Sequence, residues 1–135
     1  MNYVFRYIIS TMAILVIMAC TQEYDLTESM KRGKEIYNDF CKSCHLVGGE
    51  GVTTIYPPLA ASDYLMNHRE ESIRAVKYGQ KGKLVVNGIE YDGTMAPMGL
   101  TDQEVADVMN YILNSWGNKS DKVVTPKEVS NIKKN

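Results

Sequence analysis

The distribution of apolar and polar residues divides the chain into an apolar N-terminal stretch and a series of short amphipathic segments. Residues 8–18 form a mostly apolar run behind one positive charge, Arg6, and this run is too short to span a bilayer comfortably. From residue 27 onward, apolar positions recur three or four residues apart, which is the spacing of helices. The pattern predicts a secretory signal peptide over residues 1–19, followed by a mostly helical domain.

The domain is expected to begin with a helix over residues 27–40, capped by Asp25 or Thr27. One face of this helix is apolar but includes Gly33, although glycine is unfavourable inside a helix. A glycine on a buried face lets a second helix approach closely, so we expect a helix crossing here. The face comprises Met30, Gly33, Ile36, Tyr37 and Phe40.

The middle of the domain is predicted to form two short helices and one hairpin. The helices cover residues 62–67 and 70–78, and Gly79 ends the second. Residues 84–91 predict a small β-hairpin around Asn87-Gly88, because this pair favours a two-residue turn with positive φ at both positions.

The last predicted helix, over residues 101–116, has a clear start signal. Thr101 and Glu104 have the spacing of a capping box, and a broad apolar stripe follows them. Residues 121–135 are polar and predict a C-terminal tail outside the domain, with at most one loose helical turn near Thr125.

Length and charge limit the classes of function. The chain has 135 residues, which allows one small domain. Removing the signal peptide removes Arg6 and leaves 14 basic and 16 acidic residues, a net charge of −2. No basic face for nucleic acid is expected from this balance. The near-neutral charge also predicts only modest long-range steering of charged partners.

The chemistry of the chain is concentrated at Cys41-Lys42-Ser43-Cys44-His45. Two thiols at this spacing, followed at once by histidine, form the attachment motif of a c-type haem. Each thiol adds to one vinyl group on the same edge of the porphyrin, and His45 supplies an axial nitrogen. Alternatives are a dithiol redox pair and half of a zinc site. No βαβ unit precedes Cys41, and elsewhere only Cys20 and His68 offer cysteine or histidine ligands.

The third cysteine lies at the end of the predicted signal peptide. Ile17-Met18-Ala19-Cys20 resembles the bacterial lipobox, which implies cleavage before Cys20 and acylation of that residue. Residues 20–26 would then be a polar tether, and the protein would sit on the periplasmic side of a bacterial membrane. The alternatives are an uncleaved N-terminal anchor helix and simple cleavage after Ala19.

Residues 27–120 resemble the class I c-type cytochromes, with one covalent haem. The resemblance rests on Gly33-Lys34-Glu35-Ile36-Tyr37, on the motif ending at His45, and on Asn114-Ser115-Trp116-Gly117-Asn118 near the end. It implies an all-α fold in which the first and last helices cross beside the haem, with a small hairpin before the last helix.

The resemblance also implies further residues of the haem site. The Pro57 carbonyl would accept a hydrogen bond from His45, and Leu59 would pack on the ring; the alternative is an ordinary turn. Met95 would be the second axial ligand. In the family, proline follows the ligand directly, whereas here Ala96 intervenes, so Met98 is the alternative ligand.

An iron with both axial positions filled leaves no place for a substrate. We therefore expect an electron carrier that docks transiently with redox proteins and has no small-molecule substrate. One alternative is a haem subunit or dedicated electron donor of an oxidase, a dehydrogenase or a copper nitrite reductase. Others are an open-site haem sensor or peroxidase-like enzyme, and a thiol oxidoreductase. A bis-histidine haem would use His68 as the second ligand, but its polar neighbours Asn67, Arg69 and Glu70 favour a solvated loop residue.

Overall fold

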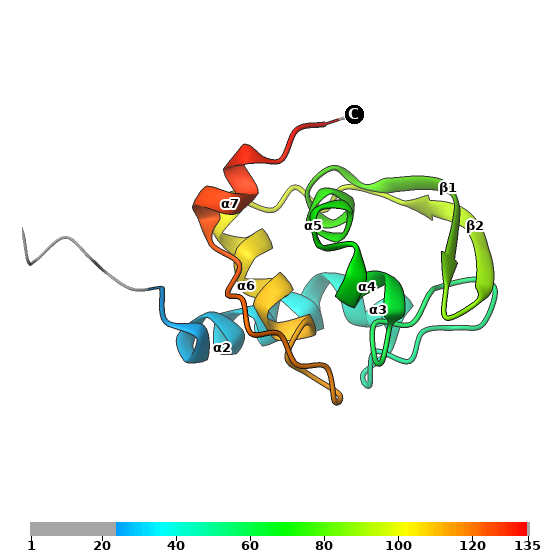
Figure 1. The fold of residues 1–135 in the computed structure, drawn as a ribbon, viewed down its shortest axis with the longest axis horizontal. Helices are drawn as coiled ribbons and strands as arrows, with labels where there is room; N and C mark the ends of the chain where they lie inside the picture. The colour runs from blue at the N-terminus through cyan, green and yellow to red at the C-terminus, as the bar shows by residue number, and fades with distance from the viewer. Residues whose placement is uncertain (1–23, 135) are drawn as a thin grey trace, which may run out of the picture.

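Two helices that pack against each other, α2 (Leu26–Ile36) and α6 (Asp102–Ile112), form the centre of the fold in a computed structural model (Figure 1). The structure describes residues 24–134, so the predicted signal peptide, Cys20 and most of the predicted tether lie outside the described residues. Within this described part, no helix has both the length and the apolar character needed to cross a membrane.

The first predicted helix is longer than expected and changes its winding. Asp25 caps α2 by accepting hydrogen bonds from the backbone N–H groups of Thr27 and Glu28. A π-helical segment, η1 (Tyr37–Cys41), follows α2, and α3 (Lys42–His45) follows η1. The expected end at residue 40 is therefore wrong, because the helical path continues through the whole Cys-x-x-Cys-His motif. Single π-helical turns often occur at functional sites, and this one leads directly into the motif.

Gly33 lies at the contact between α2 and α6, as its place on the apolar face predicts. A Cβ atom at Gly33 would come within 2.0 Å of the Asp107 carbonyl oxygen and 2.9 Å of the Tyr111 Cβ. No side chain fits at these distances, so the two helices could approach this closely only with glycine at position 33.

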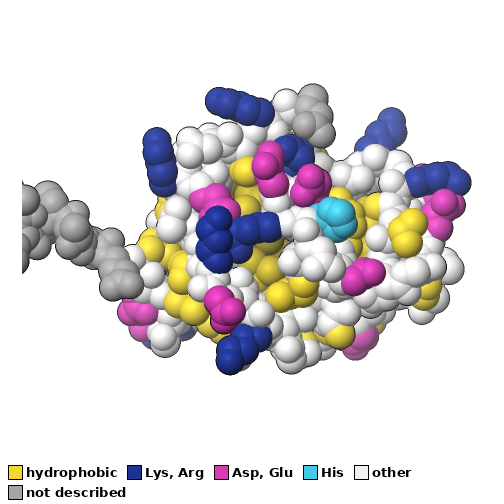
Figure 2. All heavy atoms as spheres, in the orientation of Figure 1, with side chains coloured by type: hydrophobic (Ala, Val, Ile, Leu, Met, Phe, Trp, Pro, Cys, Tyr) yellow, Lys and Arg dark blue, Asp and Glu magenta, His cyan; other side chains and the backbone are white. Residues whose placement is uncertain are grey.

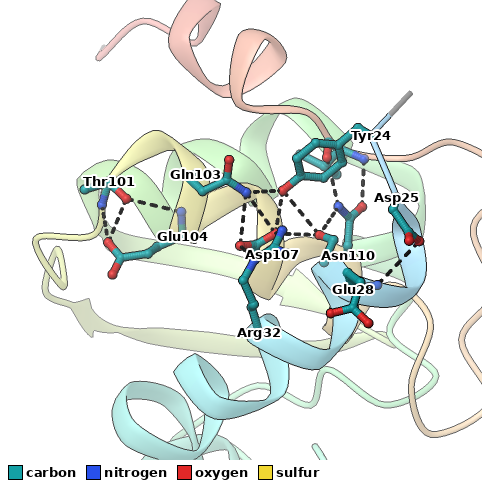
Figure 3. A network of polar contacts seen from close by, with 11 residues as sticks. Tyr24, Asp25, Glu28, Arg32, Thr101, Gln103, Glu104, Asp107 and Asn110 are labelled. Atoms are coloured by element: carbon teal, nitrogen blue, oxygen red, sulfur yellow. Dashed lines mark hydrogen bonds and ion pairs between the residues drawn. The ribbon is translucent and has the colours of Figure 1, made fainter. Parts of the chain in front are cut away.

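A network of polar side chains joins α2 and α6 (Figure 3). The Asp107 side chain is almost fully buried and accepts hydrogen bonds from Arg32 Nε at 2.7 Å, Arg32 Nη2 at 2.8 Å and Ser29 Oγ at 2.6 Å. Tyr24 and Gln103 complete its set of donors. Burial by itself would raise the pKa of Asp107, but these hydrogen bonds hold the pKa below its usual range.

The middle of the chain forms two helices, α4 (Asp63–Asn67) and α5 (Arg69–Tyr78), and one antiparallel hairpin. The hairpin strands, β1 (Gln80–Val86) and β2 (Ile89–Met95), pair from Val86–Ile89 at the turn to Gln80–Met95 at the base. Asn87 and Gly88 have positive φ, as predicted. The hairpin extends beyond residues 84–91 because its outer pairs contain polar residues and glycines, which the apolar alternation does not mark.

The end of α6 also differs from the sequence-based expectation. Its capping box at Thr101 and Glu104 is present, but the helix ends at Ile112 and not at Trp116. Trp116 has a φ of 53°, and its ring lies 5.0 Å from that of Tyr37. A Cβ on Gly49 would come within 2.5 Å of the Trp116 ring, so packing of this large ring under the Gly49 loop accompanies the early end of the helix.

The C-terminal segment is not the polar tail expected over residues 121–135. A further helix, α7 (Pro126–Asn131), packs on α6, and Val124, Val129 and Ile132 are buried in the core. The Asn110 side chain binds both backbone groups of Val124, donating to its oxygen at 2.8 Å and accepting from its nitrogen at 2.7 Å. Three apolar residues among many polar ones were too weak a periodic signal to reveal this packing.

Candidate functional site

A cavity of about 660 Å³ lies between the Cys41–His45 segment, the 54–59 loop, α5, α6 and the hairpin. Most of its wall is apolar, with Leu59, Leu65, Val76, Leu84, Val108 and Ile112 among the lining residues. The walls formed by α5 and the hairpin were not predicted from the sequence. Their only signal was the apolar residues Val76, Leu84 and Tyr91, which could equally have belonged to a solid core.

Both thiols of the motif line this cavity. Cys41 and Cys44 are free cysteines and partly buried. Burial, followed by the neighbouring Cys44, raises the pKa of Cys41 to about 11. Reactive thiols of disulfide oxidoreductases have lowered pKa values, so this environment disfavours a thiol oxidoreductase.

His45 is buried and oriented by one hydrogen bond. Its Nδ1 lies 2.9 Å from the Pro57 carbonyl oxygen, which is the contact expected from the sequence. Burial lowers the pKa of His45, although the bond to Pro57 opposes this shift. Burial therefore favours the neutral imidazole, in which Nδ1 must carry the proton to donate to a carbonyl. Nε2 then has a free electron pair, which is the state needed to bind a metal.

The other predicted site residues also reach the cavity. Leu59 lines it, and its backbone is held by Gly49 at 2.7 Å and by the Asn118 side chain at 2.8 Å. Met95 and Met98 both line the cavity. Met95 ends β2 and is held in register opposite Gln80, whereas Met98 follows in the loop after the strand.

Two alternatives from the sequence find no support in this geometry. Within residues 24–134, no three side chains among His, Cys, Asp and Glu come together as a metal-binding group, so a zinc site is disfavoured. His68 is absent from the cavity wall and stacks on Tyr64 at 4.7 Å between ring centroids, which disfavours a bis-histidine haem.

The residues present fit a covalently held haem. Two thiols and an imidazole follow one another along the cavity wall, the lining is mostly apolar, and a thioether is available from the hairpin. The fold and this site together define a class I c-type cytochrome.

Comparison with known proteins agrees with this class. A sequence model of the family described as Cytochrome c matches residues 30–116, and the chain belongs to that family. It is 34% identical over 110 residues to cytochrome c-552 of Thermus thermophilus, covering 75% of this chain and 83% of that protein. The protein is therefore an electron-transfer protein with covalently bound haem c.

Larger proteins contain a similar domain. The chain is 29% identical to the cytochrome c subunit of alcohol dehydrogenase (quinone) from Gluconacetobacter polyoxogenes, covering 75% of this chain and 22% of that subunit. It is 33% identical to the gluconate 2-dehydrogenase cytochrome c subunit of Pantoea cypripedii, covering 79% of this chain and 25% of that subunit. Each match covers about a quarter of the larger protein.

Proposed function

We propose that Cys41 and Cys44 attach the haem, that His45 and Met95 are its axial ligands, and that the protein shuttles single electrons between redox proteins. The observation that carries this proposal is the convergence of all four side chains on one apolar cavity. When bound, haem c supplies an iron that takes up and releases one electron.

The side chains around the cavity set the conditions for this exchange. The Pro57 carbonyl holds the His45 ring in one orientation and raises its basicity. Apolar side chains from α5, α6 and the hairpin exclude water, so an added positive charge is poorly stabilised. A thioether ligand acts in the same direction, because soft sulfur favours the reduced state. Together these groups favour a raised reduction potential.

Replacing each methionine in turn tests the proposed ligand. The oxidised Met95→Ala holoprotein should lose its sulfur-to-iron charge-transfer band completely, and its reduced form should bind carbon monoxide. The Met98→Ala holoprotein should keep the band, because its thioether would only pack against the wall. Optical spectra and redox titration of the three proteins measure this. Loss of the band in Met98→Ala alone would transfer the assignment to Met98, and a wild type that binds carbon monoxide readily would favour the open-site sensor.

We further propose that docking to redox partners is transient. Lysine and arginine residues are interspersed with aspartate and glutamate on the face seen in Figure 2, without a large patch of one sign. A face of mixed charge gives little long-range steering, and electron-transfer encounters are typically small and short-lived. The names of the larger relatives favour a second candidate, a haem subunit or dedicated donor of a dehydrogenase. Co-purification with a dehydrogenase subunit would favour that candidate.

A lipid anchor on the periplasmic side of a bacterial membrane is also proposed, on the basis of Ile17-Met18-Ala19-Cys20 and the apolar run before it. The mature protein should begin at Cys20, carry acyl chains and fractionate with membranes, while Cys20→Ser should lose the acyl chains. Mass spectrometry of both proteins measures this. Retention of residues 1–19 would instead indicate an uncleaved anchor, and an unmodified N-terminal Cys20 would indicate a soluble periplasmic protein.

A further inference from the structure

The β-hairpin forms one wall of the cavity and carries Met95 at its base. Nine of its residues line the cavity, among them Leu84, Val86, Tyr91 and Met95. A two-stranded hairpin is only marginally stable alone, so its position depends on what holds it. Figure 1 shows it as a bent ribbon whose turn lies far from α6 and α7.

The turn of the hairpin is tied to α4 by two reciprocal hydrogen bonds. The backbone nitrogen of Asp63 donates to Asn87 Oδ1 at 2.9 Å, and the backbone nitrogen of Asn87 donates to Asp63 Oδ1 at 2.7 Å. The same carboxylate oxygen accepts the backbone nitrogen of Tyr64 at 2.7 Å. We call the Asp63–Asn87 pair, which joins residues 24 apart in the sequence, the hairpin latch.

The base of the hairpin is held by a different contact. Gly79 ends α5 with a φ of 84°, and a Cβ there would come within 2.6 Å of the Met95 carbonyl oxygen and 3.0 Å of the Pro97 ring. The backbone of Met95 is thus fixed against the end of α5. Between base and turn, the register pairs seven residues of each strand, so a movement of the turn is transmitted along the ribbon.

We propose that the hairpin latch is a positioning device that keeps the hairpin wall closed over the position that the Met95 thioether takes in the haem site. This inference rests on the proposed assignment of Met95 as axial ligand. With the latch closed, both ends of the hairpin are held and the thioether stays at its ligating position. With the latch open, the hairpin swings about its base at Gly79 while the Met95 backbone stays in place. The cavity wall then opens, and an external ligand reaches the position of the thioether more easily.

A broken latch should loosen the hairpin without unfolding the protein. Val86 and Tyr91 are buried and keep the ribbon against the domain, and Ser62 caps α4 independently by accepting the Leu65 nitrogen at 3.1 Å. Both latch residues are exposed, and hydrogen bonds in contact with water make modest net contributions. The expected effect is therefore on ligand competition more than on global stability.

The test uses oxidised holoprotein and imidazole as the competing ligand. Asn87→Gly removes the side-chain acceptor while keeping a residue suited to the positive φ of 50°. Asp63→Ala removes the carboxylate, whereas Asp63→Asn retains an oxygen acceptor and should rescue. Lys83→Ala is the matched control, since it breaks an exposed ion pair within the hairpin, to Glu90 at 2.8 Å, and leaves the latch intact.

We expect Asn87→Gly and Asp63→Ala to bind imidazole about tenfold more tightly than wild type, which corresponds to about 1.4 kcal/mol. Asp63→Asn and Lys83→Ala should stay within about twofold of wild type. If the two latch variants lower the thermal midpoint but leave imidazole affinity unchanged, the latch is only structural and the inference is wrong. If the oxidised wild type instead lacks the sulfur-to-iron band, Met95 is not an axial ligand. The proposed ligand assignment then fails, and the inference about the latch fails with it.

Discussion

Replacing Cys41 and Cys44 together by serine should leave the protein with no covalently attached haem. A thioether bond needs a cysteine sulfur, and within residues 24–134 these are the free cysteines, both on the cavity wall. Serine preserves size but does not add to a vinyl group under the same conditions. Wild type should retain one haem per chain after denaturation, and the double variant should retain none. Mass spectrometry and haem absorbance of denatured protein measure this loss.

Single variants and Cys20 provide the controls for this experiment. Cys41→Ser and Cys44→Ser should each retain at most one thioether bond, whereas Cys20→Ser should keep the full haem content. Haem that stays bound to the denatured double variant would show that another side chain attaches it. That result would contradict the assignment of the motif.

Replacing Asp107 by alanine should cost about 1–3 kcal/mol of unfolding free energy, the range found when buried polar groups lose their hydrogen-bond partner. Asp107 is 1% exposed and accepts hydrogen bonds from Arg32 and Ser29. Its loss would leave several polar groups at the helix crossing without a hydrogen-bond partner. Denaturant unfolding of holoprotein measures the change. Lys83→Ala is a suitable control, because its exposed pair with Glu90 should contribute less than about 1 kcal/mol. Equal losses of stability in the two variants would refute a special role for the buried Asp107 carboxylate.

The same carboxylate should contribute to acid sensitivity. The pKa of Asp107 is below its ordinary value in the folded protein, so the folded state favours the ionised form. Its stabilising contribution is present above the unfolded pKa of about 3.9 and is lost as pH falls through the lower folded value. Wild type should therefore lose stability below about pH 4 more steeply than Asp107→Asn. If the unfolding free energies of the two proteins fall equally steeply below about pH 4, this linkage is contradicted.

The cofactor chemistry was predictable because it depends on local covalent spacing. Cys41, Cys44 and His45 are close in sequence, so their relation needs no knowledge of the fold. Gly33 and the capping box at Thr101 were predictable for a similar reason, since helix periodicity and capping act over one or two turns. The structure confirms the close approach at Gly33 and the cap.

The polar network around Asp107 had no comparable signal. Ser29, Arg32, Asp107 and Asn110 look like ordinary polar positions on two helices until the helices are packed. Only then does burial turn them into a connected set that also holds Val124. The C-terminal helix was missed for the same reason, because Val129 is buried by a surface that the rest of the chain creates.

The haem motif, the turn of the hairpin and the order of the main helices could be predicted from the spacing of residues, because each follows from bond geometry or from contacts among near neighbours. The tertiary structure decided that the hairpin is a wall of the haem cavity, that Asp63 holds its turn, and that residues 124–132 belong to the core. These features depend on which distant surfaces meet and exclude water. That outcome belongs to the packed chain as a whole and cannot be read from the spacing of residues.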